Sequence, residues 1–239
     1  MNSGGAEGED QPAVDNAKAP QVLGLLPLPD EAKNDPTFHR IHISTIKPEN
    51  AMELLCAAVD TLEAISTTRT LANNELGTRN ELSSGENTPT RVDELHFHPH
   101  GHDIMQQSLL CKRFISKREP PITLKEYLTR FHRYCPLSTG VYIATSLYIT
   151  RLAIVDPVIS VNRKNMHRLV LAGLRVAMKT VEDLVYSHDR VARVGGVTST
   201  ELTRLEISFC FLTDFDLRVD EQTLDNQAGT LQWYMEHPI

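Results

Sequence analysis

The feature that most constrains the fold is a succession of helical apolar stripes, each opened by a start signal, between residues 123 and 212. Thr123 is followed three residues later by Glu126, and Thr198 is followed in the same way by Glu201. In this capping-box pattern the hydroxyl and the carboxylate satisfy backbone N–H groups at the start of a helix. Apolar residues then recur at steps of three and four, and no stretch alternates as a half-buried strand does. The sequence therefore predicts an all-α fold.

Capping and turn residues divide this part of the chain into successive helices. The predicted helices are 123–135, stopped by Pro136; one from Ser138 or Thr139 to Asp156; one from Asn162 to Leu184; a short one over 190–194, closed by Gly195 and Gly196; one that begins after Thr198; and a weaker one from Asp220 to near Trp233. The helix after Thr198 is apolar nearly all round, which predicts that it lies at the centre of a bundle.

The segments before residue 120 have a different character. Residues 1–47 are acidic and rich in Gly, Pro and Ala, and we expect a disordered tail. Residues 48–66 carry a helical apolar stripe, which predicts an accessory amphipathic helix packed on the rest of the protein. The stripe consists of Met52, Leu55, Val59, Leu62 and Ile65. Residues 67–119 are polar and are predicted to form a linker that includes a histidine-rich junction.

Charge and composition exclude several classes of partner. The chain has 31 acidic and 24 basic residues, a net charge of −7, and no basic stripe outweighs the carboxylates, which argues against a nucleic-acid partner. No apolar run reaches the roughly 18 residues that a membrane-spanning helix needs. The N-terminus lacks the pattern of a signal peptide, and the four cysteines form no CxxC pair, as is typical of reduced intracellular proteins. We therefore expect a nuclear or cytoplasmic protein with no membrane partner.

The sequence contains none of the common catalytic motifs: no Walker loop, GxGxxG, GxSxG or HExxH. Four histidines alternate at positions 96, 98, 100 and 102 in HFHPHGH, but no cysteine or carboxylate pair at familiar spacing completes a metal-binding set. We expect these histidines to form a solvated junction. The first expectation is therefore a protein with no catalytic residues, no metal and no cofactor.

Two His-Asp doublets keep one enzymatic alternative open. His102-Asp103 and His188-Asp189 resemble the core of HD-type metal-dependent phosphohydrolases. His132 or His167 could supply a third nitrogen ligand. Such a site depends on a geometry that the sequence alone does not define.

One pair of charged residues stands out. Lys179 lies on a polar face of the third predicted helix, together with Arg175, Glu182 and Asp183. The simplest arrangement for Lys179 is an exposed i,i+4 ion pair with Asp183. Glu206 lies beside the apolar stripe of its helix, so its carboxylate needs a partner. That partner could be Lys179, Arg130 or a donor on a second protein.

Residues 120–217 resemble the cyclin box of the phosphate-pathway (P-type or U-type) cyclins of fungi, plants and protists. Two pieces, His167-Arg-Leu169 and Arg193-Val-Gly-Gly196, occur in the correct order and spacing. The other matching segments are 122–130, 148–151, 165–171, 177–179, 182–183, 192–198 and 201–206.

The resemblance implies a single five-helix cyclin box over residues 120–219, followed by a C-terminal helix or tail over 220–239. It also implies a non-catalytic regulatory subunit that binds and activates a cyclin-dependent protein kinase in phosphate or nutrient signalling, or in cell-cycle control. The kinase-binding residues that it implies are Lys179, Glu206, Arg130 and Asp183. A helical adaptor with no kinase partner remains an alternative.

Three positions depart from the family pattern. Thr150 replaces the usual Asp, which removes the usual partner of Arg130 and is expected to free it for Glu206 or Asp183. Thr180 replaces a Phe, and Val191 replaces a Tyr. The loss of aromatic area at position 180 predicts weaker kinase binding than is usual in the family.

Overall fold

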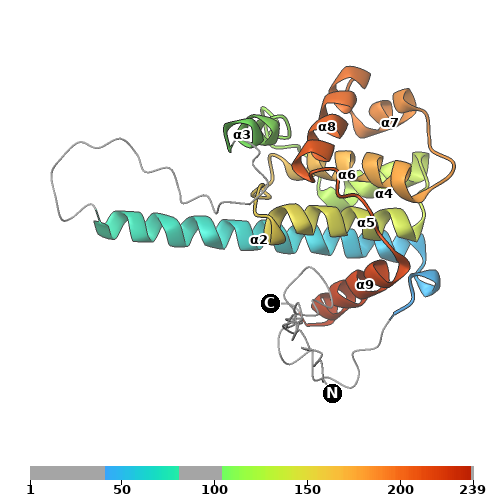
Figure 1. Cartoon of the computed structure of the whole chain (residues 1–239), viewed down its shortest axis with the longest axis horizontal. Helices are drawn as coiled ribbons and strands as arrows, with labels where there is room; N and C mark the ends of the chain where they lie inside the picture. Colours follow the sequence, from blue (N-terminus) through green and yellow to red (C-terminus); the bar gives the residue numbers. More distant parts are fainter. Residues whose placement is uncertain (1–40, 81–103, 238–239) are drawn as a thin grey trace, which may run out of the picture.

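The computed structural model describes residues 41–80 and 104–237, and every regular element in these ranges is helical (Figure 1). The predicted all-α fold is confirmed. The elements are η1 (Ile43–Thr45), α2 (Pro48–Asn80), α3 (Ile104–Lys112), α4 (Leu124–Tyr134), α5 (Thr139–Thr150) with its π-helical continuation η2 (Arg151–Val155), α6 (Met166–Val181), α7 (His188–Gly195), α8 (Ser199–Leu212) and α9 (Glu221–Glu236). Within the described ranges, no helix combines the length and the apolarity that crossing a membrane requires.

The central helix of the bundle is α5. Every residue from Val141 to Thr150 is buried, and α5 packs against α2, α6 and α9 (Figure 1). The prediction that the helix after Thr198 would be central is wrong. That helix, α8, lies at the periphery, and Ile207 and Phe211 on its outer side are each 46% exposed. A helix that is apolar on all sides can be buried completely in its own chain, or it can bury one side and leave another exposed to a second protein. The periodicity of the apolar residues is the same in both arrangements.

Most of the predicted start and stop signals form, and the exception is Asn162, described below. Both capping boxes form, and the Thr123 and Thr198 hydroxyls accept hydrogen bonds from the backbone N–H groups three residues later. Ser138 caps α5 and Asp220 caps α9 in the same way. Gly196 has φ = +72° and closes α7 in the left-handed conformation that glycine adopts without steric cost.

The predicted linker over residues 67–119 contains helical structure. The predicted helix 48–66 continues to Asn80 within the predicted linker, and α3 also lies in that linker. The hydroxyls of Thr68 and Thr70 donate to the carbonyls four residues earlier, so these polar side chains are satisfied inside the helix and do not end it. The predicted apolar stripe from Met52 to Leu62 is buried against the bundle, so α2 is an integral helix of the fold.

The third predicted helix is shorter than expected at both ends. It begins at Met166, because Asn162 accepts a hydrogen bond from the Lys164 N–H in a preceding turn and does not cap the helix. It ends at Val181, since Glu182 has an extended backbone. Leu184, the last residue of the predicted stripe, is consequently 89% exposed.

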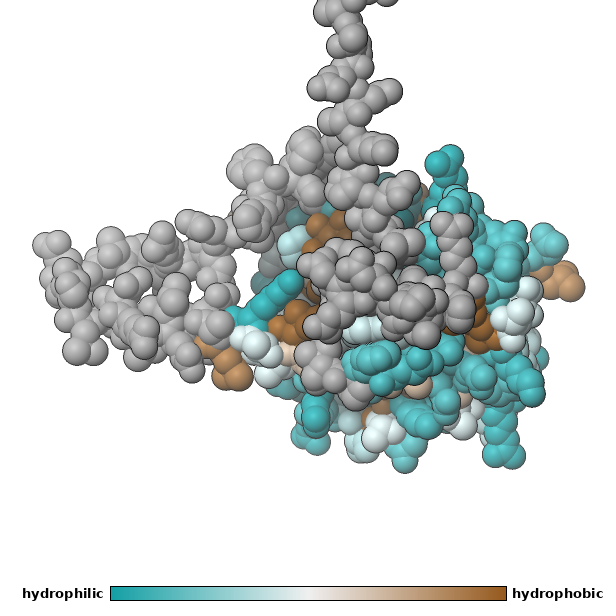
Figure 2. All heavy atoms as spheres, turned by 90° about the horizontal axis from the view of Figure 1, so that it is seen from below, coloured by the Kyte–Doolittle hydropathy of each residue, from teal (hydrophilic) through white to brown (hydrophobic). Residues whose placement is uncertain are grey.

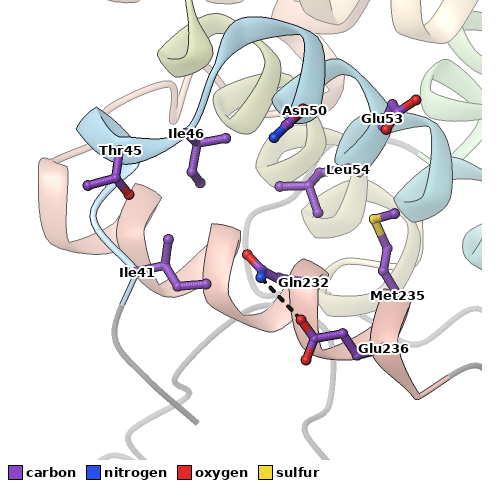
Figure 3. Close-up of a pocket in the computed structure, with 9 residues that line it drawn as sticks. All are labelled: Ile41, Thr45, Ile46, Asn50, Glu53, Leu54, Gln232, Met235 and Glu236. Carbon is purple, nitrogen blue, oxygen red and sulfur yellow. Dashed lines mark hydrogen bonds between the residues drawn. The ribbon is translucent and has the colours of Figure 1, made fainter. Parts of the chain in front are cut away.

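Helix α9 closes the side of the bundle opposite α8. It packs on α2 and α5, and the Gln227 amide donates to the buried Ser146 hydroxyl of α5 at 3.3 Å. Its Asp225 carboxylate accepts from the Ile43 N–H at 2.8 Å and fixes η1. A groove lies between η1, α2 and α9 (Figure 3), and its lining is mixed, with Ile41, Leu54 and Met235 beside polar residues. Figure 2 views the molecule from this side and shows hydrophobic residues scattered among hydrophilic ones.

Some predictions fall outside the described residues. They are the tail up to residue 40, the alternating histidines at 96, 98, 100 and 102, and the His102-Asp103 doublet.

Candidate functional site

The structure brings Lys179 and Glu206 together. Lys179 lies in the last turn of α6 and Glu206 in the middle of α8, and these two helices pack against each other. The Lys179 Nζ donates a hydrogen bond to the Glu206 Oε1. Of the partners that the sequence leaves open for Glu206, the structure therefore selects Lys179. The lysine side chain is 45% exposed and that of Glu206 is 14% exposed, so the pair reaches the surface with its ammonium end outermost.

Arg175, which the sequence places on the same helix face as Lys179, is a second partner of Glu206 that the sequence does not predict. Its side chain is only 6% exposed, and its Nε lies 3.5 Å from the Glu206 Oε2. Its Nη1 donates to the Tyr186 carbonyl at 3.0 Å, which holds the guanidinium in place. The His188 Nδ1 lies 4.0 Å from the same carboxylate oxygen. Arg175 precedes Lys179 by one helical turn, so the two side chains share a face of α6. This spacing is the sequence feature that could have indicated Arg175 as a second partner of Glu206.

The thiol one turn after Glu206 is not prepared for nucleophilic chemistry. Burial, and secondarily the Glu206 carboxylate, raises the pKa of Cys210 above its ordinary value, although Lys179 opposes this. A reactive cysteine requires the opposite shift. Cys210 therefore serves as a small apolar side chain beside the ion pair.

Helix α8 and the residues after it also carry exposed apolar side chains. On α8 the residue after Glu206 is Ile207, and Phe211 lies one turn further along; Phe215 follows the end of α8 and is 59% exposed. The rings of Phe211 and Phe215 meet edge to face, with centroids 5.2 Å apart. Phe215 has φ = +56°, a left-handed conformation that is costly for a residue with a side chain. We call Lys179, Glu206, Ile207, Phe211 and Phe215 the α6–α8 surface.

The other two predicted site residues do not join this pair. The Arg130 Nη2 donates to the Val194 carbonyl at the end of α7, at 2.9 Å, so the prediction that Arg130 pairs with Glu206 or Asp183 is wrong. Asp183 is exposed and lies beyond the last residue of α6. The expected i,i+4 pair with Lys179 is therefore absent, because residue 183 does not continue the helix.

The three departures from the family pattern occupy different environments. Thr150 is fully buried in α5, and its hydroxyl has no hydrogen-bond partner within the described part of the chain. Val191 is fully buried in α7. Thr180 is exposed next to Lys179, and its Oγ1 lies 3.2 Å from the Tyr148 hydroxyl.

The three histidines of the phosphohydrolase alternative that lie in the described residues, His132, His167 and His188, are engaged in other bonds. The His188 Nε2 contacts the Ser199 carbonyl at 2.9 Å, and the Asp189 carboxylate accepts from the Ser199 hydroxyl at 2.6 Å. The His132 Nδ1 lies 2.8 Å from the Tyr142 hydroxyl, and the His167 Nε2 lies 3.0 Å from the Ile122 carbonyl. Among the described side chains, those of residues 41–71 and 105–237, no three His, Cys, Asp or Glu are grouped as a metal site would require.

The fold and this surface define a class: an all-α bundle with an ion pair between α6 and α8 and exposed apolar side chains on α8. The chain belongs to the cyclin family, because the family model described as Cyclin matches residues 57–217. The match begins within α2 and ends just after α8. The resemblance to P-type and U-type cyclins is confirmed by the relatives that the sequence matches.

Three relatives illustrate the similarity. The chain is 33% identical over 129 residues to the PHO85 cyclin-like protein psl1 of Schizosaccharomyces pombe, covering 53% of each protein. It is 31% identical over 165 residues to Cyclin-U2-2 of Arabidopsis thaliana, covering 69% of this chain and 63% of the relative. It is 30% identical over 129 residues to PHO85 cyclin-7 of Saccharomyces cerevisiae, covering 49% and 45%. The matched part thus spans between 45% and 63% of these relatives.

Proposed function

We propose that this protein is a non-catalytic regulatory subunit that binds and activates a cyclin-dependent protein kinase through the α6–α8 surface. Membership of the cyclin family supports this class of function, and the names of two relatives, which read PHO85 cyclin, support a kinase of the phosphate-pathway type. The process would be phosphate or nutrient signalling or cell-cycle control, in the nucleus or the cytoplasm.

The chemistry of the ion pair suits the recognition of another protein's backbone. The Lys179 ammonium has three donors for carbonyl oxygens, and the Glu206 carboxylate accepts from amide N–H groups. A charge-assisted hydrogen bond of this kind contributes about 1.5–3 kcal/mol when a partner excludes water from it. Arg175, fixed behind the carboxylate by the Tyr186 carbonyl, orients Glu206 before the partner arrives.

The observation that carries the proposal is the presence of exposed apolar side chains beside that pair. Ile207 and Phe211 lie on the same helix as Glu206, and each is 46% exposed. Aromatic and other apolar side chains are enriched at the centre of protein interfaces, where they act as anchors for the partner.

Activation would follow from binding energy alone. An active kinase keeps the glutamate of its regulatory helix paired with the lysine that positions the ATP phosphates. A subunit that binds the kinase only with this helix turned inward shifts the population toward the active state.

Co-purification of the kinase tests the proposal. The tagged chain is expressed in cells of its source, and the bound proteins are identified by mass spectrometry. Lys179→Ala should reduce the recovered kinase by about tenfold or more, since it removes one charge-assisted interaction. Lys117→Ala is the control: it removes the charge of another exposed lysine, which lies in the loop before α4 and not on α6 or α8.

The control protein should recover as much kinase as the wild type. Failure of the wild-type chain to recover any cyclin-dependent kinase would contradict the proposal. Equal losses in the two lysine variants would contradict the assignment of the α6–α8 surface.

A further inference from the structure

A second surface, formed by α4 and α7, carries a cluster of arginines. Arg130 and Arg133 are three residues apart on α4, and Arg190 and Arg193 are three residues apart on α7. Side chains at this spacing share one face of a helix. All four are exposed, and α4 and α7 pack against each other (Figure 1). We call these four arginines and Tyr134 the α4–α7 basic surface.

Hydrogen bonds between the two helices hold this surface together. The Arg130 Nη2 donates to the Val194 carbonyl of α7 at 2.9 Å, and the Arg190 Nε donates to the Tyr134 carbonyl of α4 at 3.2 Å. Two shallow clefts, of about 640 and 370 Å³, meet at Tyr134. The first is lined by Arg130 and Arg133 and the second by Arg190 and Arg193, so the clefts form one continuous basic region.

The positive charge of this region is not neutralised by the described part of the chain. Within it, none of the four guanidinium groups forms an ion pair with a carboxylate. The two carboxylates that line the clefts are engaged locally: Glu126 accepts from the Thr123 N–H at 2.8 Å, and Asp189 accepts from the Ser199 hydroxyl at 2.6 Å. A concentrated cationic surface on a chain with a net charge of −7 is suited to bind an anion.

We propose that the α4–α7 basic surface binds a phosphorylated segment of a partner protein. A phosphorylated side chain carries about −1.5 to −2 charges and three acceptor oxygens, so it can bind more guanidinium groups at once, and more strongly, than a single carboxylate can. Arg130 and Arg190 are already oriented by carbonyls of the opposite helix, whereas the Arg193 guanidinium makes no hydrogen bond to the described part of the chain. None of these residues belongs to the α6–α8 surface, so the inference does not depend on kinase binding.

The test uses the purified full chain and a fluorescein-labelled peptide with one phosphoserine flanked by glutamates, followed by fluorescence anisotropy. The double variant Arg133→Glu/Arg193→Glu should bind the phosphopeptide at least about tenfold more weakly than the wild type. Within the described residues neither side chain bonds to a backbone carbonyl, but both lie in the last turn of a helix, where a cation is favourable, so the variant should unfold at a slightly lower temperature and remain folded in the binding assay. Raising the salt concentration from about 50 to about 200 mM should weaken the binding to the wild type.

The matched control is Lys117→Glu/Arg118→Glu, which makes the same change in net charge in the exposed loop before α4 and lines neither cleft. It should bind the phosphopeptide as the wild type does. Equal loss in both double variants, no loss in the α4–α7 variant, or no binding to the wild type would overturn the proposal. Equally tight binding of the same peptide with glutamate in place of phosphoserine would overturn the assignment to phosphate.

Discussion

Replacement of Glu206 by glutamine should destabilise the domain as well as weaken kinase binding, because it leaves the buried Arg175 guanidinium without its anion. The side chains of Glu206 and Arg175 are 14% and 6% exposed. Breaking a fully buried ion pair costs about 3–5 kcal/mol, and breaking an exposed one costs about 0.2–1 kcal/mol. Arg175 retains its bond to the Tyr186 carbonyl, and its Nε lies 3.5 Å from the carboxylate, so we expect an intermediate loss of about 2 kcal/mol.

Urea unfolding followed by circular dichroism measures this loss. Lys179→Met removes the more exposed partner and should cost no more than about 1 kcal/mol. In a double-mutant cycle, Glu206→Gln combined with Arg175→Met should cost less than the sum of the single changes by about 1 kcal/mol, because no unpaired cation is left behind. A Glu206→Gln domain as stable as the wild type would refute this description of the site, and strictly additive losses would show that the two side chains do not interact.

Three further predictions concern the scaffold. Thr198→Ala removes the capping box of α8 and should lower the free energy of unfolding by about 1 kcal/mol in urea titrations. The same change at Thr200, an exposed residue of α8 that does not cap the helix, should not lower it. Hydrogen bonds from Thr198 lower the pKa of the Glu201 carboxyl below its ordinary value of 4.5. The ionised carboxylate therefore stabilises the fold above pH 4.5, and this stabilisation is lost as the pH falls through the lower folded-state pKa. The free energy of unfolding of Glu201→Gln should consequently depend less on pH in the acid range. Gly196→Ala should cost about 1–2 kcal/mol in the same assay, purely through its backbone, because an added Cβ would meet no atom within 4 Å while φ is +72°; an unchanged midpoint would contradict this.

The sequence predicted those features of the fold that local hydrogen bonds determine. The capping boxes at Thr123 and Thr198 and the left-handed Gly196 each depend on a few neighbouring residues, so their patterns could be recognised directly. The extension of α2 past residue 66 was not predicted, because Thr68 and Thr70 can satisfy their hydroxyls either in a helix or in a loop.

The candidate site was predictable only in part, because it depends on contacts between distant segments. A carboxylate beside an apolar stripe indicated that Glu206 needed a partner, but Lys179 and Arg130 were equally acceptable from the sequence. The structure selects Lys179 because the end of α6 crosses α8, while Arg130 points to α7. The apolar outer side of α8 was interpreted as core, because periodicity does not reveal which of two apolar sides is covered by the same chain.

The most direct test of the central claim is site-specific photocrosslinking. A benzophenone amino acid is placed at Ile207, beside Glu206, and in a second protein at Met235 of α9, which has a similar exposure (46% and 47%) on the other side of the bundle. After irradiation of cells, mass spectrometry identifies the crosslinked proteins. The account predicts a crosslink from position 207 to a cyclin-dependent kinase and none from position 235. A kinase that co-purifies with the chain but crosslinks only from position 235 would contradict the claim that the α6–α8 surface binds it.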